Sequence, residues 1–480
     1  MKTKSLKINF IMNSILTMSQ FIFPLITFPY VSRILLPEGI GKVSFATSII
    51  SYFNMFAQLG IPTYGVRACA KIRDDKQKLT KTVQELLIIN IIMGVVSYIF
   101  LFLMIIFVPK FQQEKSLLLI ISSTIFFNTI GMEWLYKALE QYTYITIRSI
   151  IFKFIALVAM FLLIHQKSDY IIYGGVSIFA SSASNVFNFF HINKYVSLKP
   201  VKKYNIKTHL KAVAIFFAMS CATTIYTHLD TVMLGFIGTN ADVGYYNAAV
   251  KVKTILVSIV TSLGVVLLPR ASYYVENQML EEFYRITKKA INFVFLLAIP
   301  MMIYFIIFAK NGILLLSGKA YIESVYPMQI IMPTILFIGL TNIMGIQILV
   351  PLGRENVVLL SEIGGVIVDI FLNSLLIPKY ASVGAAFGTL AAECVVFMIQ
   401  YTVLRSEVKD AFNSVHYLKI VFAVFIATIL SLCIKVLQIG NFASLCISSF
   451  VFFCSFYFIL IILKEPFLLG IKNDFLKKFK

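Results

Sequence analysis

The chain holds about fourteen apolar runs, each long enough to cross a membrane as a helix. They fall at 8–31, 41–64, 84–108, 116–136, 146–165, 170–192, 211–235, 243–268, 289–309, 324–350, 356–377, 382–404, 417–437 and 440–463. Of all residues, 59% are hydrophobic and only 13% are charged, and the mean hydropathy is +0.87. Too few polar residues remain to cover the surface of a soluble protein of 480 residues. We therefore expect an all-α polytopic membrane protein.

Lysine and arginine are distributed unevenly between alternate loops. One set of loops, together with both ends of the chain, holds roughly thirty of them, and the other set holds roughly eight. Cytoplasmic loops carry the excess of positive charge, so this bias predicts that the N- and C-termini are both cytoplasmic. Anionic lipid headgroups explain the net charge of +20, so no nucleic-acid partner is expected.

Patterns that would indicate catalysis or a bound metal are missing from the sequence. The six cysteines form no CxxC pair, the five histidines do not cluster, and no complete phosphate-binding loop is present. The sequence therefore predicts no catalytic residues, no metal site and no cofactor, and the chain is not expected to be an enzyme.

The first part of the chain matches a second part about 203 residues further on. With this shift Gly41 falls on Gly244, and Arg67 falls on Arg270. Six spans separate the copies, so both would have the same orientation in the membrane, which makes this a parallel repeat. We predict a six-helix lobe at 1–205, a second six-helix lobe at 206–410, and a helix pair with a basic cytoplasmic tail at 411–480.

Polar side chains follow one face of the first, second, seventh and eighth spans, at positions that correspond in the repeat. They are Thr17, Gln20 and Thr27; Ser44, Ser48, Ser51 and Gln58; Ser220, Thr223, Thr227 and Asp230; and Asn247, Lys251, Thr254, Ser258 and Thr261. One interpretation is hydrogen bonding between helices. The other is a hydrated groove between the lobes. Lys251 and Asp230 favour the groove, because a charge at mid-membrane is costly unless it is wet or paired.

Four segments, in order along the chain, resemble the Wzx-type repeat-unit flippases. Residues 131–153 read GMEWLYKALEQYTYITIRSIIFK, similar to the family's EW-FQG-E---YI--R. Residues 32–46 (SRILLPEGIGKVSFA), 226–251 (YTHLDTVMLGFIGTNADVGYYNAAVK) and 373–393 (NSLLIPKYASVGAAFGTLAAE) resemble its other characteristic stretches. The chain departs from the pattern at Tyr136-Lys137-Ala138, where the family has Phe-Gln-Gly, and at Ala381, where it has glycine.

This resemblance implies a member of the multidrug/oligosaccharidyl-lipid/polysaccharide (MOP) exporter superfamily in the bacterial inner membrane. Such a protein moves undecaprenyl-pyrophosphate-linked oligosaccharide to the outer leaflet for O-antigen or another surface polysaccharide. The implied partners are this lipid-linked oligosaccharide, membrane lipids, a polysaccharide polymerase and a chain-length regulator. The membrane potential, H⁺ or Na⁺ would supply the energy. The alternative is a multidrug or cation exporter of the same superfamily, which would favour an acidic cavity.

Cations and polar groups near the predicted groove are the candidates for binding a sugar–pyrophosphate headgroup. They are Arg33, Arg67, Lys251, Arg270, Ser48, Asn247 and Thr254. For Arg67 and Arg270, a role in topology alone is the alternative. Asp230 and Glu133 are candidate ion carriers. Asp230 would otherwise pair with Lys251, and Glu133 would otherwise be an interfacial residue beside Trp134.

Overall fold

The computed structural model describes residues 6–201, 203–435 and 440–470, and in these ranges every regular element is a helix. This confirms the all-α membrane fold. By length and apolar composition, nine of the described helices could span a membrane, or ten if the bent pair Lys319–Ile331 and Thr334–Leu349 counts as one span. The figure of fourteen spans stays a prediction. The basic ends of the chain, 1–5 and 471–480, lie outside the described residues.

Two helices are long enough to hold two spans each. α1 (Leu6–Gln58) has 53 residues and α16 (Glu355–Val403) has 49. At 1.5 Å per residue each would be roughly 75–80 Å long, more than twice the hydrocarbon core of about 30 Å. Both are broken near the middle: Leu36 has φ 59° and Ala381 has φ 45°. Leu36 precedes Pro37, whose ring disfavours helical geometry in the residue before it. Each helix therefore corresponds to two of the predicted runs.

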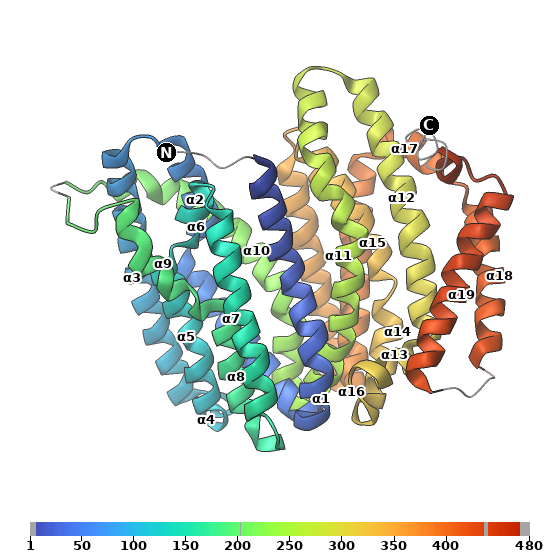
Figure 1. The fold of residues 1–480 in the computed structure, drawn as a ribbon, viewed down its shortest axis with the longest axis horizontal. Coiled ribbons are helices and arrows are strands. Elements are labelled where there is room, and N and C mark those ends of the chain that lie inside the picture. Colours follow the sequence, from blue (N-terminus) through green and yellow to red (C-terminus); the bar gives the residue numbers. More distant parts are fainter. Residues whose placement is uncertain (1–5, 202, 436–439, 471–480) are drawn as a thin grey trace. The chain divides into compact units, whose positions relative to one another are not determined.

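By their contacts, residues 1–244 form one compact unit. After α1 it contains α2 (Ile61–Lys71), α3 (Lys76–Phe107), α4 (Pro109–Gln113), α5 (Lys115–Gly131), α6 (Glu133–Ala138), α7 (Tyr142–Leu163), η1 (Lys167–Asp169), α8 (Tyr170–Ile178), η2 (Phe179–Ala183), α9 (Asn185–His191), η3 (Ile192–Lys194) and α10 (Lys207–Ile237). α1 packs against α3, α5, α7 and α10. α2 and α6 lie together at one end of this unit, and α4 lies at the other (Figure 1).

Residues 245–480 form the second unit. Its helices are α11 (Asn240–Glu276), whose first turn belongs to the first unit, α12 (Leu280–Ile307), α13 (Ala309–Leu316), η4 (Lys319–Ser324), α14 (Val325–Ile331), α15 (Thr334–Thr341), η5 (Asn342–Leu349), α16, α17 (Arg405–Asn413), α18 (Tyr417–Lys435) and α19 (Asn441–Ile462). α16 packs on α14 and α15, and α18 packs on α19 (Figure 1).

This division by contacts differs from the division inferred from the repeat. α10 follows the predicted boundary at residue 205, yet it packs against α1 and α2 of the first unit. The repeat concerns ancestry and the contacts concern packing, so the predicted lobes at 1–205 and 206–410 stay a prediction.

Candidate functional site

An ionic cluster around the buried Arg148 lies where α6, α7 and α9 meet in the first unit. The side chain of Arg148, on α7, is 6% exposed, and its Nη2 lies 3.1 Å from Asn185 Oδ1 and 3.6 Å from Glu133 Oε2. The other carboxylate oxygen of Glu133 is 2.8 Å from Lys137 Nζ. Two guanidinium nitrogens of Arg148, Nε and Nη1, have no hydrogen-bond partner among the described residues. The cluster thus holds two cations and one anion.

Asparagine side chains extend this cluster to α5 and α1. Asn185 Nδ2 donates to Asn128 Oδ1 at 3.1 Å, and Asn128 Nδ2 donates to Asn54 Oδ1 at 3.2 Å. Asn188 Nδ2 donates to the carbonyl of Gly131 at 2.7 Å. A Cβ at Gly131 would lie 2.5 Å from the Cβ of Asn185, so only glycine allows α5 and α9 to approach this closely. The polar line therefore fixes the packing of three helices.

α7 carries a second cation one and a half turns further on. Lys153 Nζ donates to Ser19 Oγ of α1 at 2.8 Å, and both side chains are partly buried. Sequence reasoning selected neither Arg148 nor Lys153. Arg148 is the arginine that ends the YI--R part of the family-like segment, and that position was the available signal. Lys153 interrupts an apolar run, which also could have been noticed.

The predicted candidates are divided between the two units. In the first unit Ser48 is 5% exposed and its Oγ lies 3.2 Å from His228 Nδ1 of α10. Asp230, on the same helix, is 6% exposed. Arg33 hydrogen-bonds to the carbonyl of Pro29 on the surface, and Arg67 is exposed on α2.

The other candidates lie on α11 in the second unit. Lys251, Thr254 and Arg270 are exposed, and Asn247 is partly buried. Glu133, one of the two predicted ion carriers, is in the first unit and is engaged by two cations. No contact tests the role of any of these residues, so their functions stay predictions.

Hydroxyl groups of the polar stripes bond mostly to their own helices. Thr17, Ser51, Thr223, Thr227 and Thr254 each donate to the carbonyl four residues earlier, at 2.7–3.2 Å. Such bonds satisfy the hydroxyl hydrogen locally and leave the oxygen able to accept another. Four of the five side chains, all except Ser51, are exposed. At these positions the hydroxyl hydrogens therefore do not link one helix to another.

Helices α1 and α11 approach very closely at two glycines that correspond in the repeat. A Cβ at Gly41 would lie 1.7 Å from the carbonyl oxygen of Asn240, and a Cβ at Gly244 would lie 2.0 Å from that of Pro37. Gly41 and Gly244 are 203 residues apart, as are Pro37 and Asn240 (244 − 41 and 240 − 37). The two contacts are therefore reciprocal. Both pairs lie within residues 1–244, in the first unit.

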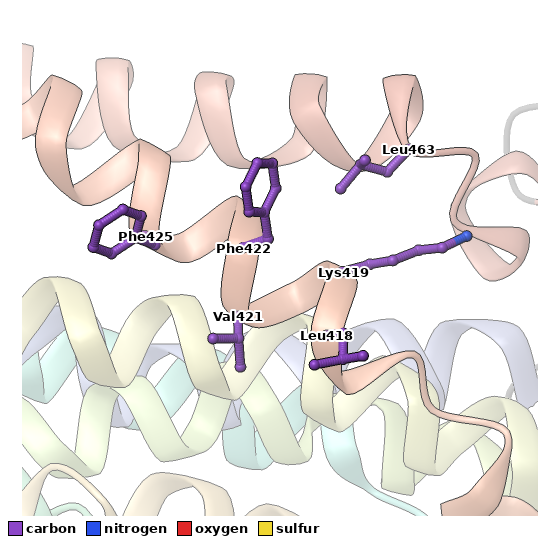
Figure 2. Close-up of a pocket in the computed structure, with 6 residues that line it drawn as sticks. All are labelled: Leu418, Lys419, Val421, Phe422, Phe425 and Leu463. Atoms are coloured by element: carbon purple, nitrogen blue, oxygen red, sulfur yellow. The ribbon is translucent and has the colours of Figure 1, made fainter.

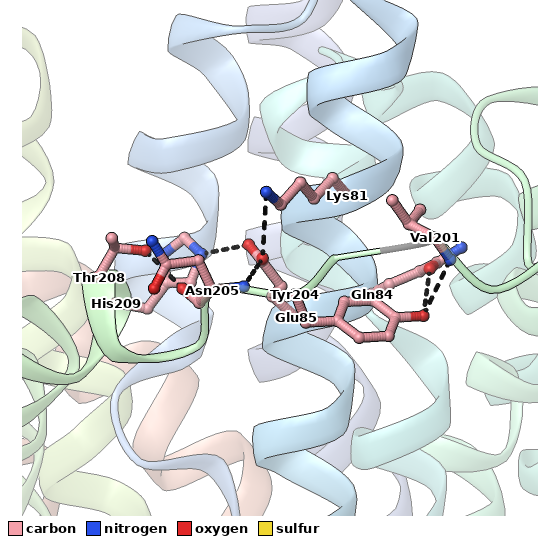
Figure 3. A network of polar contacts seen from close by, with 8 residues as sticks. All are labelled: Lys81, Gln84, Glu85, Val201, Tyr204, Asn205, Thr208 and His209. Carbon is pink, nitrogen blue, oxygen red and sulfur yellow. Dashed lines mark hydrogen bonds and ion pairs between the residues drawn. The ribbon is translucent and has the colours of Figure 1, made fainter.

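The segment that leads into α10 is fastened to α3 by Glu85, which is 3% exposed (Figure 3). Its Oε1 accepts from the backbone N–H of Asn205 at 2.5 Å and lies 4.0 Å from Lys81 Nζ. Its Oε2 is 2.9 Å from His209 Nε2, and His209 Nδ1 is 2.8 Å from the hydroxyl of Tyr64 on α2. One carboxylate thus ties α3 to the start of α10, and His209 extends the tie to α2.

Gln84 adds to this fastening, which we call the linker clasp (Gln84, Glu85, Tyr204, Asn205 and His209). Gln84 Nε2 donates to the carbonyls of Ser197 and Lys199 at 2.7 and 2.8 Å. Its Oε1 accepts from the hydroxyl of Tyr204 at 2.9 Å (Figure 3). The chain between α9 and α10 is consequently held on the surface of α3 along much of its length.

The second unit contains a buried polar group and an apolar groove. Asn373 Nδ2 donates to Asp369 Oδ1 at 3.1 Å, next to Gly388, where a Cβ would lie 2.2 Å from Asn373 Oδ1. The groove has a volume of about 610 Å³ and is lined by Leu418, Lys419, Val421, Phe422, Phe425 and Leu463 (Figure 2). Lys419 Nζ donates to the carbonyl of Lys464 at 3.1 Å, so the groove walls are almost wholly apolar. In the described part of the chain, no three His, Cys, Asp or Glu side chains gather as a metal site would require.

Comparison with known proteins shows the family. Residues 6–275, more than half of the chain, match the family described as polysaccharide biosynthesis protein. The chain belongs to this family. A protein of Escherichia coli K12, provisionally named an O-antigen transporter, is 24% identical over 84% of this chain and 97% of its own length. A protein of Shigella dysenteriae with the same name is 24% identical over 80% of this chain and 96% of its own length.

Solved structures show the same fold. The lipid II flippase MurJ in an inward closed conformation matches with a TM-score of 0.72 and 16% identity, covering 95% of this chain and 99% of that one. An inward-facing multidrug transporter of the MATE family matches with a TM-score of 0.65 and 14% identity, over 84% of this chain and 99% of that one. The family match and the named relatives confirm the resemblance to Wzx-type polysaccharide transporters and the assignment as a multi-pass membrane protein.

Proposed function

We propose that this protein is a flippase. It moves an undecaprenyl-pyrophosphate-linked oligosaccharide from the cytoplasmic to the outer leaflet of the bacterial inner membrane by alternating access. The observation that carries the proposal is the family match over residues 6–275, joined by relatives named for O-antigen transport. A lipid II flippase also shares the fold over nearly the whole chain, and its name refers to a lipid-linked substrate.

The physical chemistry of such a substrate suits the residues available. A pyrophosphate and many hydroxyls cannot enter hydrocarbon bare, because each unpaired polar group is costly to bury. Exposed hydroxyls such as Thr223 and Thr227, and the exposed cation of Lys251, would replace water around the headgroup. The apolar groove on α18 suits a hydrocarbon chain (Figure 2). Headgroup and tail would thus be handled by different parts of the protein.

Energy for outward movement is available without ATP. An interior-negative potential favours export of an anion by about 2.3 kcal/mol per charge per 100 mV. Exchange for H⁺ or Na⁺, carried by Asp230 or Glu133, is a further proposed source. The polymerase and the chain-length regulator that act on the exported repeat unit are proposed partners, as are the surrounding lipids. N- and C-termini in the cytoplasm complete the proposed topology.

Genetic complementation tests the proposal. Cells lacking the gene receive the wild type, Lys251→Ala or Lys253→Ala. Lys253 is the matched control, because two residues along a helix place it on a different face. We expect the wild type and Lys253→Ala to restore surface polymer, while Lys251→Ala leaves lipid-linked repeat units on the cytoplasmic side. If deletion leaves surface polymer intact and changes drug tolerance instead, the multidrug-exporter alternative is correct.

A further inference from the structure

Lys153 lies at the centre of a membrane span of the first unit. α7 has 22 residues, Tyr142 to Leu163, and Lys153 is the twelfth of them. At 1.5 Å per residue the helix is roughly 33 Å long, about the thickness of the hydrocarbon core. Neighbours on the outer face of α7 are lipid-type side chains, such as Phe154, which is 64% exposed. A lysine at this depth is costly, and such residues usually mark a substrate path.

Its surroundings give the ammonium group of Lys153 no carboxylate in contact, and Glu133 attracts it only from beyond ion-pair distance. Among the described residues, the ammonium group of Lys153 donates one hydrogen bond, to Ser19 Oγ at 2.8 Å. The hydroxyl of Ser19 in turn donates to the backbone carbonyl of Leu16. No carboxylate oxygen of the described residues lies within the 4.0 Å of an ion pair. An ammonium group has three donors, so two remain for a ligand. A neutral hydroxyl positions the cation without neutralising it.

Arg148 on the same helix shows what a compensated cation looks like. It is buried, lies 3.6 Å from Glu133 and bonds to Asn185, so it belongs to the packing of the helices. Lys153 is partly buried, its hydrogen-bond partner among the described residues is a hydroxyl, and Glu133 lies beyond ion-pair distance. The two cations of α7 therefore differ in kind, although they are five residues apart.

Ser19, the partner of Lys153, is close in sequence to Thr17 and Gln20 of the predicted polar face of α1, and both of those side chains are exposed. At about 100° per residue, Ser19 is turned by about 160° from Thr17 and about 100° from Gln20, so Lys153 lies beside that face and not on it. Its ammonium group, held by one hydroxyl and with two donors left, fits a phosphate oxyanion.

From these observations we infer that Lys153, positioned by Ser19, contacts the phosphate oxyanions of the lipid-linked substrate halfway across the membrane. The inference rests on the proposed function and adds a binding residue to it. The same chemistry would suit the phosphate of a bulk anionic phospholipid, so the test must separate the two sources.

Binding is measured first on the purified full-length protein in nanodiscs that contain phosphatidylglycerol, with undecaprenyl pyrophosphate as the probe and undecaprenol as the control lipid. We expect Lys153→Met to raise the Kd for undecaprenyl pyrophosphate at least tenfold. Lys153→Arg should raise it no more than about threefold, because it keeps the charge. The exposed control Lys78→Met should leave it unchanged. An unchanged Kd in Lys153→Met, or an effect only on phosphatidylglycerol retention, would overturn the inference.

Restoring the charge chemically gives a second readout that misfolding cannot imitate. All six native cysteines are first replaced, and Lys153→Cys is introduced into that chain in cells lacking the gene. We expect surface polymer to fall at least tenfold, and to return when an aminoethyl methanethiosulfonate reagent recreates a lysine-like ammonium. The sulfonatoethyl reagent, which adds a negative charge, should not restore it. Phe154→Cys, facing lipid, should respond to neither reagent.

Failure of the flippase proposal and failure of this inference look different. If the wild type itself does not restore surface polymer, the proposed function is wrong. If the wild type restores it and Lys153→Met restores it equally well at the same membrane abundance, the function stands and Lys153 is a structural residue.

Discussion

Replacing Gly41 with alanine should weaken the contact between α1 and α11 in a way that can be calculated from the structure. The added methyl carbon would lie 1.7 Å from the carbonyl oxygen of Asn240 and 2.7 Å from its carbonyl carbon. Ordinary carbon–oxygen contacts are about 3.3–3.6 Å, so the helices must separate by roughly 1.6 Å or more. The obstacle is backbone, which cannot rotate away as a side chain can. Gly41→Ala therefore acts on the position of whole helices.

Overpacking of this kind costs about 1–3 kcal/mol. If the close contact between α1 and α11 belongs to one state of a transport cycle, that cost lowers the equilibrium constant for forming this state roughly 5- to 150-fold. Ser48 is a suitable reporter, because it is 5% exposed, lies about two turns after Gly41 on α1 and faces His228 of α10. We expect the thiol of Ser48→Cys, introduced into a chain without other cysteines, to react 5- to 150-fold faster with a soluble maleimide when Gly41→Ala is present.

Gly94→Ala is the matched control for this measurement. A Cβ there would meet only Thr129 Oγ1, at 3.5 Å, which is an ordinary contact. The same glycine-to-alanine change inside a helix should then be neutral or stabilising by about 0.4–1 kcal/mol. Reaction rates that agree within twofold for Gly41→Ala, Gly94→Ala and the parent would refute the reasoning, because the close contact would then not resist separation.

Three further outcomes can be checked on the purified protein. Ala381→Gly should stabilise the protein against thermal unfolding by up to roughly 1.6 kcal/mol, because φ 45° strains alanine by about 1–2 kcal/mol, while the greater freedom of glycine in the unfolded chain offsets about 0.4–1 kcal/mol of that gain; a lower midpoint would contradict this. Glu85→Gln should cost about 1–3 kcal/mol and speed protease cleavage near Asn205, since a buried carboxylate that serves Asn205 and His209 is lost; unchanged cleavage would mean that the clasp does not hold the linker. Asp75 caps the N-terminus of α3, and the backbone hydrogen bonds it accepts there lower the pKa of its carboxyl group. The stabilisation that this cap gives to α3 is therefore fully present above about pH 4, the usual aspartate pKa, and is lost as the pH falls through the lowered pKa. Cleavage at the α2–α3 loop by an acid-active protease should then stay constant from pH 6 to 4 and rise only below, whereas a rise above pH 4 would contradict the assignment.

Sequence patterns were sufficient for the fold because the membrane imposes simple rules on a chain. The described part of each predicted run is mainly helical, and the break at Leu36 follows from the proline after it. The glycine that the related family has at position 381 makes sense once Ala381 is seen with a positive φ. The correspondence of Gly41 and Gly244 was also predicted from the repeat, but their close contacts with the facing backbone were not.

Side-chain partners could not be predicted in the same way. Lys153 and Arg148 look alike in an apolar run, and only the positions of Ser19 and Glu133 distinguish a cation bonded to a hydroxyl from one in an ion pair. Likewise, the sequence around Glu85 shows only one acid in a basic, amphipathic stretch. Its partners Asn205 and His209 lie 120 and 124 residues later, and only the structure shows that they contact it. Contacts between distant parts of the chain depend on packing, which a single sequence does not specify.

The reciprocal contact of Gly41 and Gly244 also bears on how such a chain arose. When residue i of one copy touches residue j of the other and j touches i, the arrangement is that of an isologous interface between identical subunits. Gly41 on Asn240 and Gly244 on Pro37 obey this rule within one polypeptide. We infer that the duplicated ancestor was a half-length protein that already paired with itself through this glycine, and that fusion of two copies turned a contact between subunits into one within a single chain.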